Sequence, residues 1–179
     1  MSDLVLTLIG PDRPGLVEAM AEVIAAHGGN WLESRMAHLA GKFAGILRVE
    51  APAEKAEALT AALATLQAQG LRVVAEPSGP VGEPDGRTME LELVGLDRPG
   101  IVREISQLLA REGVNVEELH TDRTSAPMSG EMLFSAKARV RLPAQADLAR
   151  LRSGLERMAD DMMVEIRLLE TALQTRGRR

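Results

Sequence analysis

The chain of 179 residues contains no cysteine and no long apolar run. The absence of cysteine excludes a disulfide framework, a thiolate metal site and a cysteine nucleophile, and it is compatible with the reducing cytosol. The first residues, MSDLVLTLIG, carry an acid where a signal peptide has bases, and Thr7 interrupts their short apolar run. No later run approaches the length that spans a membrane. We therefore expect a cytoplasmic protein with no membrane partner.

Basic residues are fewer than acidic ones, 21 against 26, which gives a formal net charge of -5. Such a charge opposes the counterion-release attraction that drives non-specific binding to nucleic acid, and no helix-turn-helix pattern is present. Two basic groups stand out: the tail residues Arg176, Arg178 and Arg179, and the alternating residues Lys137, Arg139 and Arg141. Their simplest interpretations are a polar terminus and the solvent side of a strand. We expect no direct nucleic-acid partner.

Motifs for catalysis and for metal binding are missing as well. The histidines His27, His38 and His120 fall in different predicted elements without ligand spacing, and no Gly-x-Ser-x-Gly or phosphate-loop pattern accompanies them. His27 falls at a predicted helix end, where capping explains it. Asp160 and Asp161 fall in a predicted turn before a strand, where adjacent carboxylates commonly face water. We expect no catalytic residue, no metal and no cofactor, and therefore not an enzyme.

An internal repeat is present, since IGPDRPG at residues 9–15 returns as VGLDRPG at residues 94–100. With the same shift of 85 residues, further matches follow, at Ala25 and Ala110, Gly28 and Gly113, Asn30 and Asn115, and Glu33 and Glu118. Collinear matches of this kind are not a coincidence of one short motif. They indicate that the chain is a duplication.

Each copy has the pattern of a strand followed by a helix. Asp12 and Asp97 are expected at the helix N-cap, and Pro14 and Pro99 in the first helical turn, which needs no N–H group at that point. Apolar residues follow at helical spacing. A glycine of each copy is expected to end the helix in the left-handed conformation: Gly28 and Gly113.

The remaining segments complete the same order in both copies. The predicted strands are 4–9, 31–39, 46–51 and 71–76 in the first copy, and 89–94, 116–123, 132–142 and 163–169 in the second. The predicted second helices are marked by Leu59, Leu63 and Leu66, and by Leu148, Leu151, Leu155 and Met158. The glycine-containing stretches AGKFAG and TSAPMSG are expected to turn hairpins between the second and third strands.

The order β-α-β-β-α-β, present twice, is that of the ferredoxin-like fold, in which right-handed crossovers place both helices on one face of a four-stranded antiparallel sheet. The sequence thus predicts an α+β protein with domains at 1–76 and 88–179, the second with a basic C-terminal tail. The linker, 77–87, is rich in proline and glycine. Because such small domains have marginal cores, we expect their sheet faces or edges to pair with each other or with a second subunit, as a homodimer.

With the DRPG turn, the helix after it and the Gly-x-Asn before the second strand, both copies resemble ACT domains, the small-molecule-sensing modules attached to many amino-acid enzymes. This resemblance covers nearly the whole chain. Two repeats without a catalytic domain, and the stretch NWLESRMAHLAGKFAGILRV, more narrowly resemble the glycine cleavage system transcriptional repressor group.

The resemblance implies that an amino acid binds where the first strand turns into the first helix and meets the second strand of a neighbouring unit. That role falls on Asp12, Arg13, Pro14, Gly15 and Asn30, and on Asp97, Arg98, Pro99, Gly100 and Asn115. A helix start offers N–H groups to a carboxylate, the asparagine can donate and accept, and the aspartate can face an ammonium group. Caps and turns explain the same residues without a ligand.

Capping does not explain Arg13 and Arg98. Either arginine would clamp a carboxylate or pair with glutamates of the adjoining domain. The two copies also differ beside the motif, where Gly29 becomes Val114 and Pro11 becomes Leu96. The two pockets are therefore expected to differ.

Three functions fit these expectations. The first is an amino-acid-responsive regulator of transcription that acts through a protein partner, as the resemblance to the repressor group implies. The second is a detached regulatory subunit of an amino-acid or folate enzyme, since similar repeats precede phosphatase and deformylase domains. The third is an oligomerisation module without a ligand.

Overall fold

The computed structural model describes residues 1–79, 82, 85–127 and 129–170, and the chain forms two compact units, Met1–Gly82 and Glu83–Arg179. The expected basic tail, with Arg176, Arg178 and Arg179, lies outside the described residues, as does part of the expected linker. Among the helices that are described, none is both long and apolar enough to cross a membrane.

The first unit has the element order predicted for the first copy. Its elements are β1 (Ser2–Pro11), α1 (Leu16–Ala26), β2 (Asn30–Leu39), β3 (Lys42–Ala51), the short 3-10 helix η1 (Ala53–Lys55), α2 (Ala56–Thr65), the 3-10 helix η2 (Leu66–Gln69) and β4 (Arg72–Ser78). The four strands form one antiparallel sheet in the order β2-β3-β1-β4.

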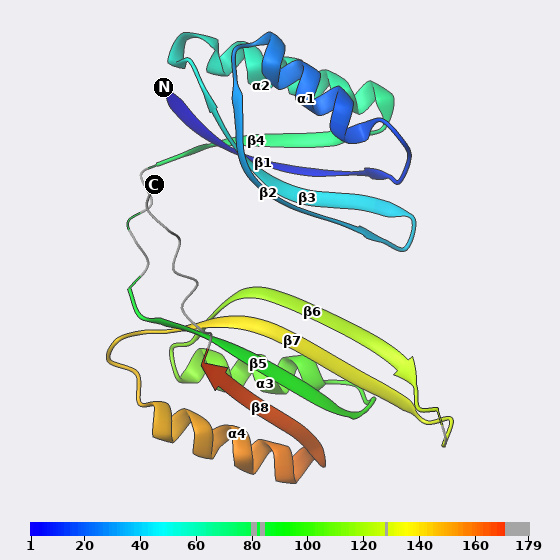
Figure 1. The fold of residues 1–179 in the computed structure, drawn as a ribbon, viewed down its shortest axis with the longest axis vertical. Helices are drawn as coiled ribbons and strands as arrows, with labels where there is room; N and C mark the ends of the chain where they lie inside the picture. The colour runs from blue at the N-terminus through cyan, green and yellow to red at the C-terminus, as the bar shows by residue number, and fades with distance from the viewer. Residues whose placement is uncertain (80–81, 83–84, 128, 171–179) are drawn as a thin grey trace. The chain divides into compact units, whose positions relative to one another are not determined.

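The second unit repeats this arrangement. Its elements are β5 (Arg87–Leu96), α3 (Ile101–Arg111), β6 (Asn115–Ser125), β7 (Met132–Leu142), α4 (Leu148–Met162) and β8 (Val164–Glu170). Its antiparallel sheet has the equivalent order β6-β7-β5-β8. In each unit both helices lie on one face of the sheet (Figure 1). The predicted α+β class with two ferredoxin-like βαββαβ folds is confirmed.

Strand alternation builds the two cores. In β1, Leu4, Leu6 and Leu8 are buried in the core of the first unit, whereas Thr7 and Ile9, at alternate positions, are exposed. The period of two residues sends alternate side chains to opposite faces, so the buried set faces the helices. A second core of the same kind forms in the other unit.

The helix ends agree with prediction. Gly28 and Gly113 have φ angles of 71° and 70°. The N–H of Gly28 bonds the carbonyl of Ala25, and that of Gly29 bonds the carbonyl of Ile24, both at 2.9 Å. These two bonds define a Schellman motif, in which a left-handed glycine satisfies the last carbonyl groups of a helix. The helix ends were therefore readable from the glycine positions.

The expected helix starts were wrong by three residues. Gly15 and Gly100 occupy the N-cap positions with φ angles of 88° and 95°, and no side chain caps either helix. Asp12 and Pro14, like Asp97 and Pro99, therefore precede the helix. The chain needs a left-handed residue before the helix can begin, and glycine adopts that conformation at the lowest cost.

Two further expectations require correction. The predicted AGKFAG turn is narrower, because Ala40 and Gly41 alone connect β2 to β3, with φ angles of 48° and 73°. Gly45 instead lies within β3, where an added Cβ would meet the Arg35 carbonyl oxygen at 2.4 Å. Asp160 and Asp161 lie in the last turn of α4 rather than in a turn after it, and both are exposed.

Candidate functional site

The turn between β1 and α1 carries four of the predicted site residues, Asp12, Arg13, Pro14 and Gly15. The first glycine of the motif, Gly10, lets the neighbouring chain approach, since an added Cβ would lie 2.8 Å from the Gly70 carbonyl oxygen. No side chain accepts a hydrogen bond from the N–H groups in the first turn of α1. The turn therefore leaves the positive end of a helix open to an anion.

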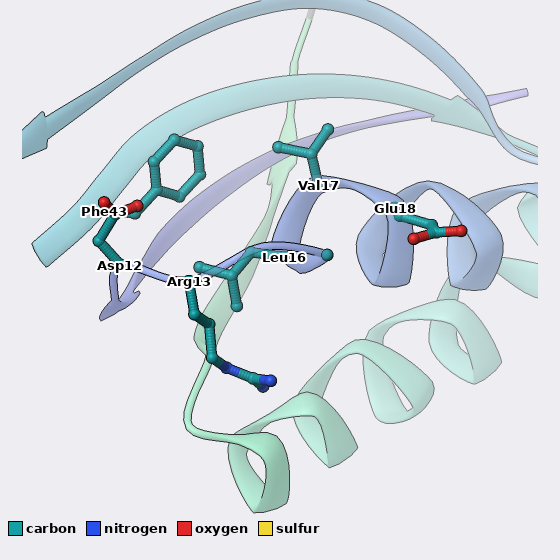
Figure 2. Close-up of a pocket in the computed structure, with 7 residues that line it drawn as sticks. Asp12, Arg13, Leu16, Val17, Glu18 and Phe43 are labelled. Carbon is teal, nitrogen blue, oxygen red and sulfur yellow. The ribbon is translucent and has the colours of Figure 1, made fainter.

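A pocket of about 210 Å³ opens at this turn (Figure 2). It is lined by Asp12, Arg13, Gly15, Leu16, Val17, Glu18 and Phe43. Phe43 projects from β3 beside Asp12, whereas Val17 and Glu18 belong to the first turn of α1. The lining thus combines one cation, two carboxylates and an apolar wall.

Arg13 is exposed and donates a hydrogen bond to the backbone carbonyl oxygen of Gln69, the last residue of η2. In Figure 2 its side chain extends away from Phe43. Within the described part of the chain no carboxylate forms an ion pair with Arg13. A single bond to a backbone carbonyl leaves most of the guanidinium donors available.

Asp12 is fixed through its backbone, because its N–H donates to the Gly41 carbonyl at 3.0 Å. Its carboxylate oxygen Oδ2 lies 3.6 Å from Nε2 of His38, at the end of β2. The hydrogen bond ties the turn to the β2–β3 hairpin and places the carboxylate at the rim of the pocket.

In the equivalent turn of the second unit, between β5 and α3, both charged side chains of the motif form ion pairs. Arg98 donates to both carboxylate oxygens of Glu104, at 2.9 and 2.8 Å. Their mutual hydrogen bonds raise the pKa of Arg98 and lower the pKa of Glu104. Asp97 likewise pairs with Nε of Arg123 at 2.5 Å. Glu104 belongs to the same unit as Arg98. The glutamate that pairs with this arginine therefore lies in its own domain and not in the adjoining one.

Asn30 and Asn115 lie away from the turns of their own units. Asn30 begins β2 and is paired in register with Glu50, near the end of β3, whereas the Asp12 turn follows Pro11, which is paired with Lys42 at the start of β3. Nearly the whole of β3 separates them, roughly 25 Å at the usual rise of a strand. Asn115 is paired with Arg141 at the corresponding end of β7. Neither asparagine therefore lies at the turn of its own unit.

The sequence reasoning missed several neighbours of these turns: His38, Phe43, Gln69, Glu104 and Arg123. A usable signal existed for one pair of them. With the shift of 85 residues, His38 falls on Arg123 as Asp12 falls on Asp97. Both copies thus place a cation-forming side chain against the aspartate of the motif.

His27 and the basic side chains of β7, which the sequence also singled out, make their contacts outside these two turns. His27 holds the Val23 carbonyl through Nδ1 at 2.8 Å, which is the helix-end role expected for it. No group of three or more metal-ligating side chains gathers in residues 1–170 apart from the gaps at 80–81, 83–84 and 128. The basic residues of β7 lie on a polar face as expected, and they form ion pairs: Lys137 with Glu92, Arg139 with Glu117 and Glu118, and Arg141 with Glu117.

Comparison with known proteins gives the same two-part organisation. One ACT domain model matches residues 2–76 and a second matches residues 85–165. No curated protein matches the chain. Among solved structures, an unknown protein from Galdieria sulphuraria shares 31% identity, with 96% of this chain and 99% of that one covered and a TM-score of 0.86.

A second solved structure has been described as that of a suggested glycine cleavage system transcriptional repressor. The two sequences are 19% identical, and the match covers 95% of this chain and 98% of that one. The TM-score of 0.71 shows a common fold. The repeat, the two βαββαβ units and the family matches agree: the chain belongs to the ACT domain family and carries two ACT domains in tandem.

Proposed function

We propose that this regulatory ACT protein senses an amino acid at the turn between β1 and α1, and passes that signal to a protein that controls transcription of amino-acid metabolism genes. The observation that carries the proposal is the difference between the two arginines. Arg98 is held by the carboxylate of Glu104, whereas Arg13 has no acidic partner among the described residues. The first unit therefore retains a cation for a ligand carboxylate.

The groups at this turn match the two ends of an amino acid. The open helix start and Arg13 suit the α-carboxylate, because backbone N–H groups and a guanidinium both donate to anions. Asp12 and Glu18 line the same pocket and suit the α-ammonium group. The half-buried Phe43 offers an apolar wall to the side chain of the ligand. A volume of about 210 Å³ fits a small amino acid.

The remaining predicted ligand groups complete the proposal. In it, Asn30 or Asn115 of a second copy of the chain contributes to the site, in a homodimer. Arg98, Pro99 and Gly100 form the corresponding turn of the second unit, where the ion pair with Glu104 competes with any ligand carboxylate. The first turn is thus the primary site.

The transcriptional role is proposed from the fold and tandem organisation shared with the suggested repressor, over 95% of this chain. The net charge of -5 and the ion-paired arginines of β7 favour action through a protein partner over direct contact with DNA. Glycine and serine are the first ligands to test, since the repressor group is linked to glycine cleavage.

Thermal unfolding with a panel of the common amino acids tests the sensing role. A ligand that binds only the folded chain at a hundredfold excess over its Kd stabilises it by roughly 2.7 kcal/mol, which moves the Tm visibly. We expect one or a few amino acids to do so. Arg13→Gln is expected to abolish the shift, while the matched variant Arg98→Gln keeps it.

Two results would count against this assignment. If no amino acid changes the Tm of the wild-type chain, the turn is only a helix start and the oligomerisation role stands instead. If Arg98→Gln removes the response and Arg13→Gln does not, the second turn is the site. Affinity capture with the loaded and unloaded chain then separates a transcriptional partner from a metabolic enzyme.

A further inference from the structure

The second unit contains an apolar cavity of about 160 Å³ between α3 and the β6–β7 side of its sheet. Its floor is formed by Ala136 and Ala138 of β7, and one wall by Ile105 and Leu109 of α3. Ser106 is the one polar side chain among the residues that line it, and no charged side chain lines it. The cavity lies in the second unit, whereas the pocket lined by Asp12 and Arg13 lies in the first.

Comparison of the two repeats shows why this space exists. Ala138 is paired with Leu91 as Leu47 is paired with Leu6, so the first unit has a leucine where the second has an alanine. Val116 likewise falls on Trp31 after the shift of 85 residues, and both precede the same register shift in their strands. Leu47 is 1% exposed, and Trp31 packs against the core of the first unit. The fold can therefore fill this place, and the second unit leaves it open.

We propose that this cavity binds a small uncharged apolar molecule, about the size of benzene, that carries at most one hydrogen-bonding group. A cavity of about 150 Å³ lined by Leu, Ile and Phe stays dry and accepts benzene or xenon. The present lining is of the same kind, with Phe134 at the end nearest the β6–β7 loop. The hydroxyl of Ser106 can bond a single polar group, whereas a charged ligand would lose its hydration without a partner.

The residues at the solvent side of the cavity leave an entrance. Val102, Val116 and Leu119 line it and are 41%, 39% and 49% exposed. These three side chains come from α3 and from β6, so a ligand can enter between the helix and the edge strand without opening the sheet. A ligand at this place contacts the helix that follows the second DRPG turn, and its binding is independent of the amino-acid site proposed in the first unit.

Titration of the full chain with benzene, followed by methyl NMR, tests the proposal. We expect saturable shifts of the methyl signals of Val102, Val116, Leu119 and Ala138, and no shifts at the equivalent Val17 and Leu47 of the first unit. Shifts that rise linearly without saturation, or that affect both units alike, would overturn the proposal. So would changes of the same signals on dilution of the protein without benzene, because they would show that a second copy covers the cavity.

Substitutions fill the cavity as the first unit does. Ala138→Leu places the side chain of Leu47 at the equivalent position, and we expect it to abolish benzene binding while the chain remains folded. Ala138→Val gives partial filling and should weaken binding if the leucine variant does not fold. The matched control is Ala110→Leu, on the exposed side of α3, which should bind benzene as the wild type does. Unchanged affinity in both Ala138 variants would contradict the assignment.

Discussion

Arg98 holds the carboxylate of Glu104 through two hydrogen bonds, whereas Arg13, its equivalent in the first repeat, bonds the backbone carbonyl of Gln69. The cause is one position in the following helix, because Glu104 of α3 falls on Ala19 of α1 after the shift of 85 residues. The duplication has kept the backbone of the turn in both units and has changed its charge. This difference separates an open anion site from a closed ion pair.

Glu104→Gln should lower stability slightly, and more at neutral than at acidic pH. Hydrogen bonding to Arg98 lowers the pKa of Glu104 in the folded chain. A lowered pKa contributes stability above the unfolded value and loses it as the pH falls through the folded value. The effect is small because both side chains are about a third exposed.

The measurement is the Tm of wild type and variant from pH 7 down to pH 3. The two curves should converge at the acidic end, and salt should narrow the gap at pH 7. Glu22→Gln, on the exposed side of α1, is the control for the loss of a surface carboxylate. A gap of constant size across this range would show that the carboxylate charge contributes nothing.

The helix spacing, strand alternation and terminal glycines predicted the order of elements, because each is a local property of the chain. The helix starts were missed since Asp12 and Gly15 are both common cap residues, and only the backbone shows that Gly15 takes the left-handed angle. The distance between Asn30 and Asp12 within one unit was not part of the prediction. It depends on strand register, which the repeat alignment does not contain.

Gly15→Ala should destabilise the chain by about 1–2 kcal/mol, the usual cost of a left-handed conformation for a residue with a Cβ. An added Cβ at Gly15 meets no atom within 4 Å, so the cost comes from the backbone angle of 88° alone. Urea unfolding measures it. Gly79→Ala is the control, since Gly79 has open space and no such angle. Equal midpoints for the two variants would contradict the argument.

Leu47→Ala should cost about 2–5 kcal/mol of unfolding free energy, because it removes a buried leucine that is 1% exposed. Its neighbour Ile46 points to the other face of the sheet and is 49% exposed. Ile46→Ala should therefore cost less than about 1 kcal/mol. Denaturant unfolding of both variants checks the comparison. A similar cost for both would mean that the open face of the sheet is covered in solution.

The purified chain should fail to retard duplex DNA at a physiological salt concentration. Its net charge is -5, and the basic side chains of β7 are engaged with acids: Lys137 lies 2.7 Å from Glu92, and Arg141 lies 2.5 Å from Glu117. Hydrogen bonding between Lys137 and Glu92 raises the pKa of the lysine and lowers the pKa of the glutamate. Both groups are therefore ionised at neutral pH, and their opposite charges offset each other.

Gel retardation of the full chain, including its basic tail, measures this directly. A variant with Glu92→Gln and Glu117→Gln removes two carboxylates that face the basic side chains of β7 and is the informative comparison. It should retard DNA at low salt and lose that binding as salt rises, because binding that depends on phosphate contacts falls steeply with salt. Tight, salt-sensitive retardation by the unmodified chain would instead favour direct DNA binding over action through a protein partner.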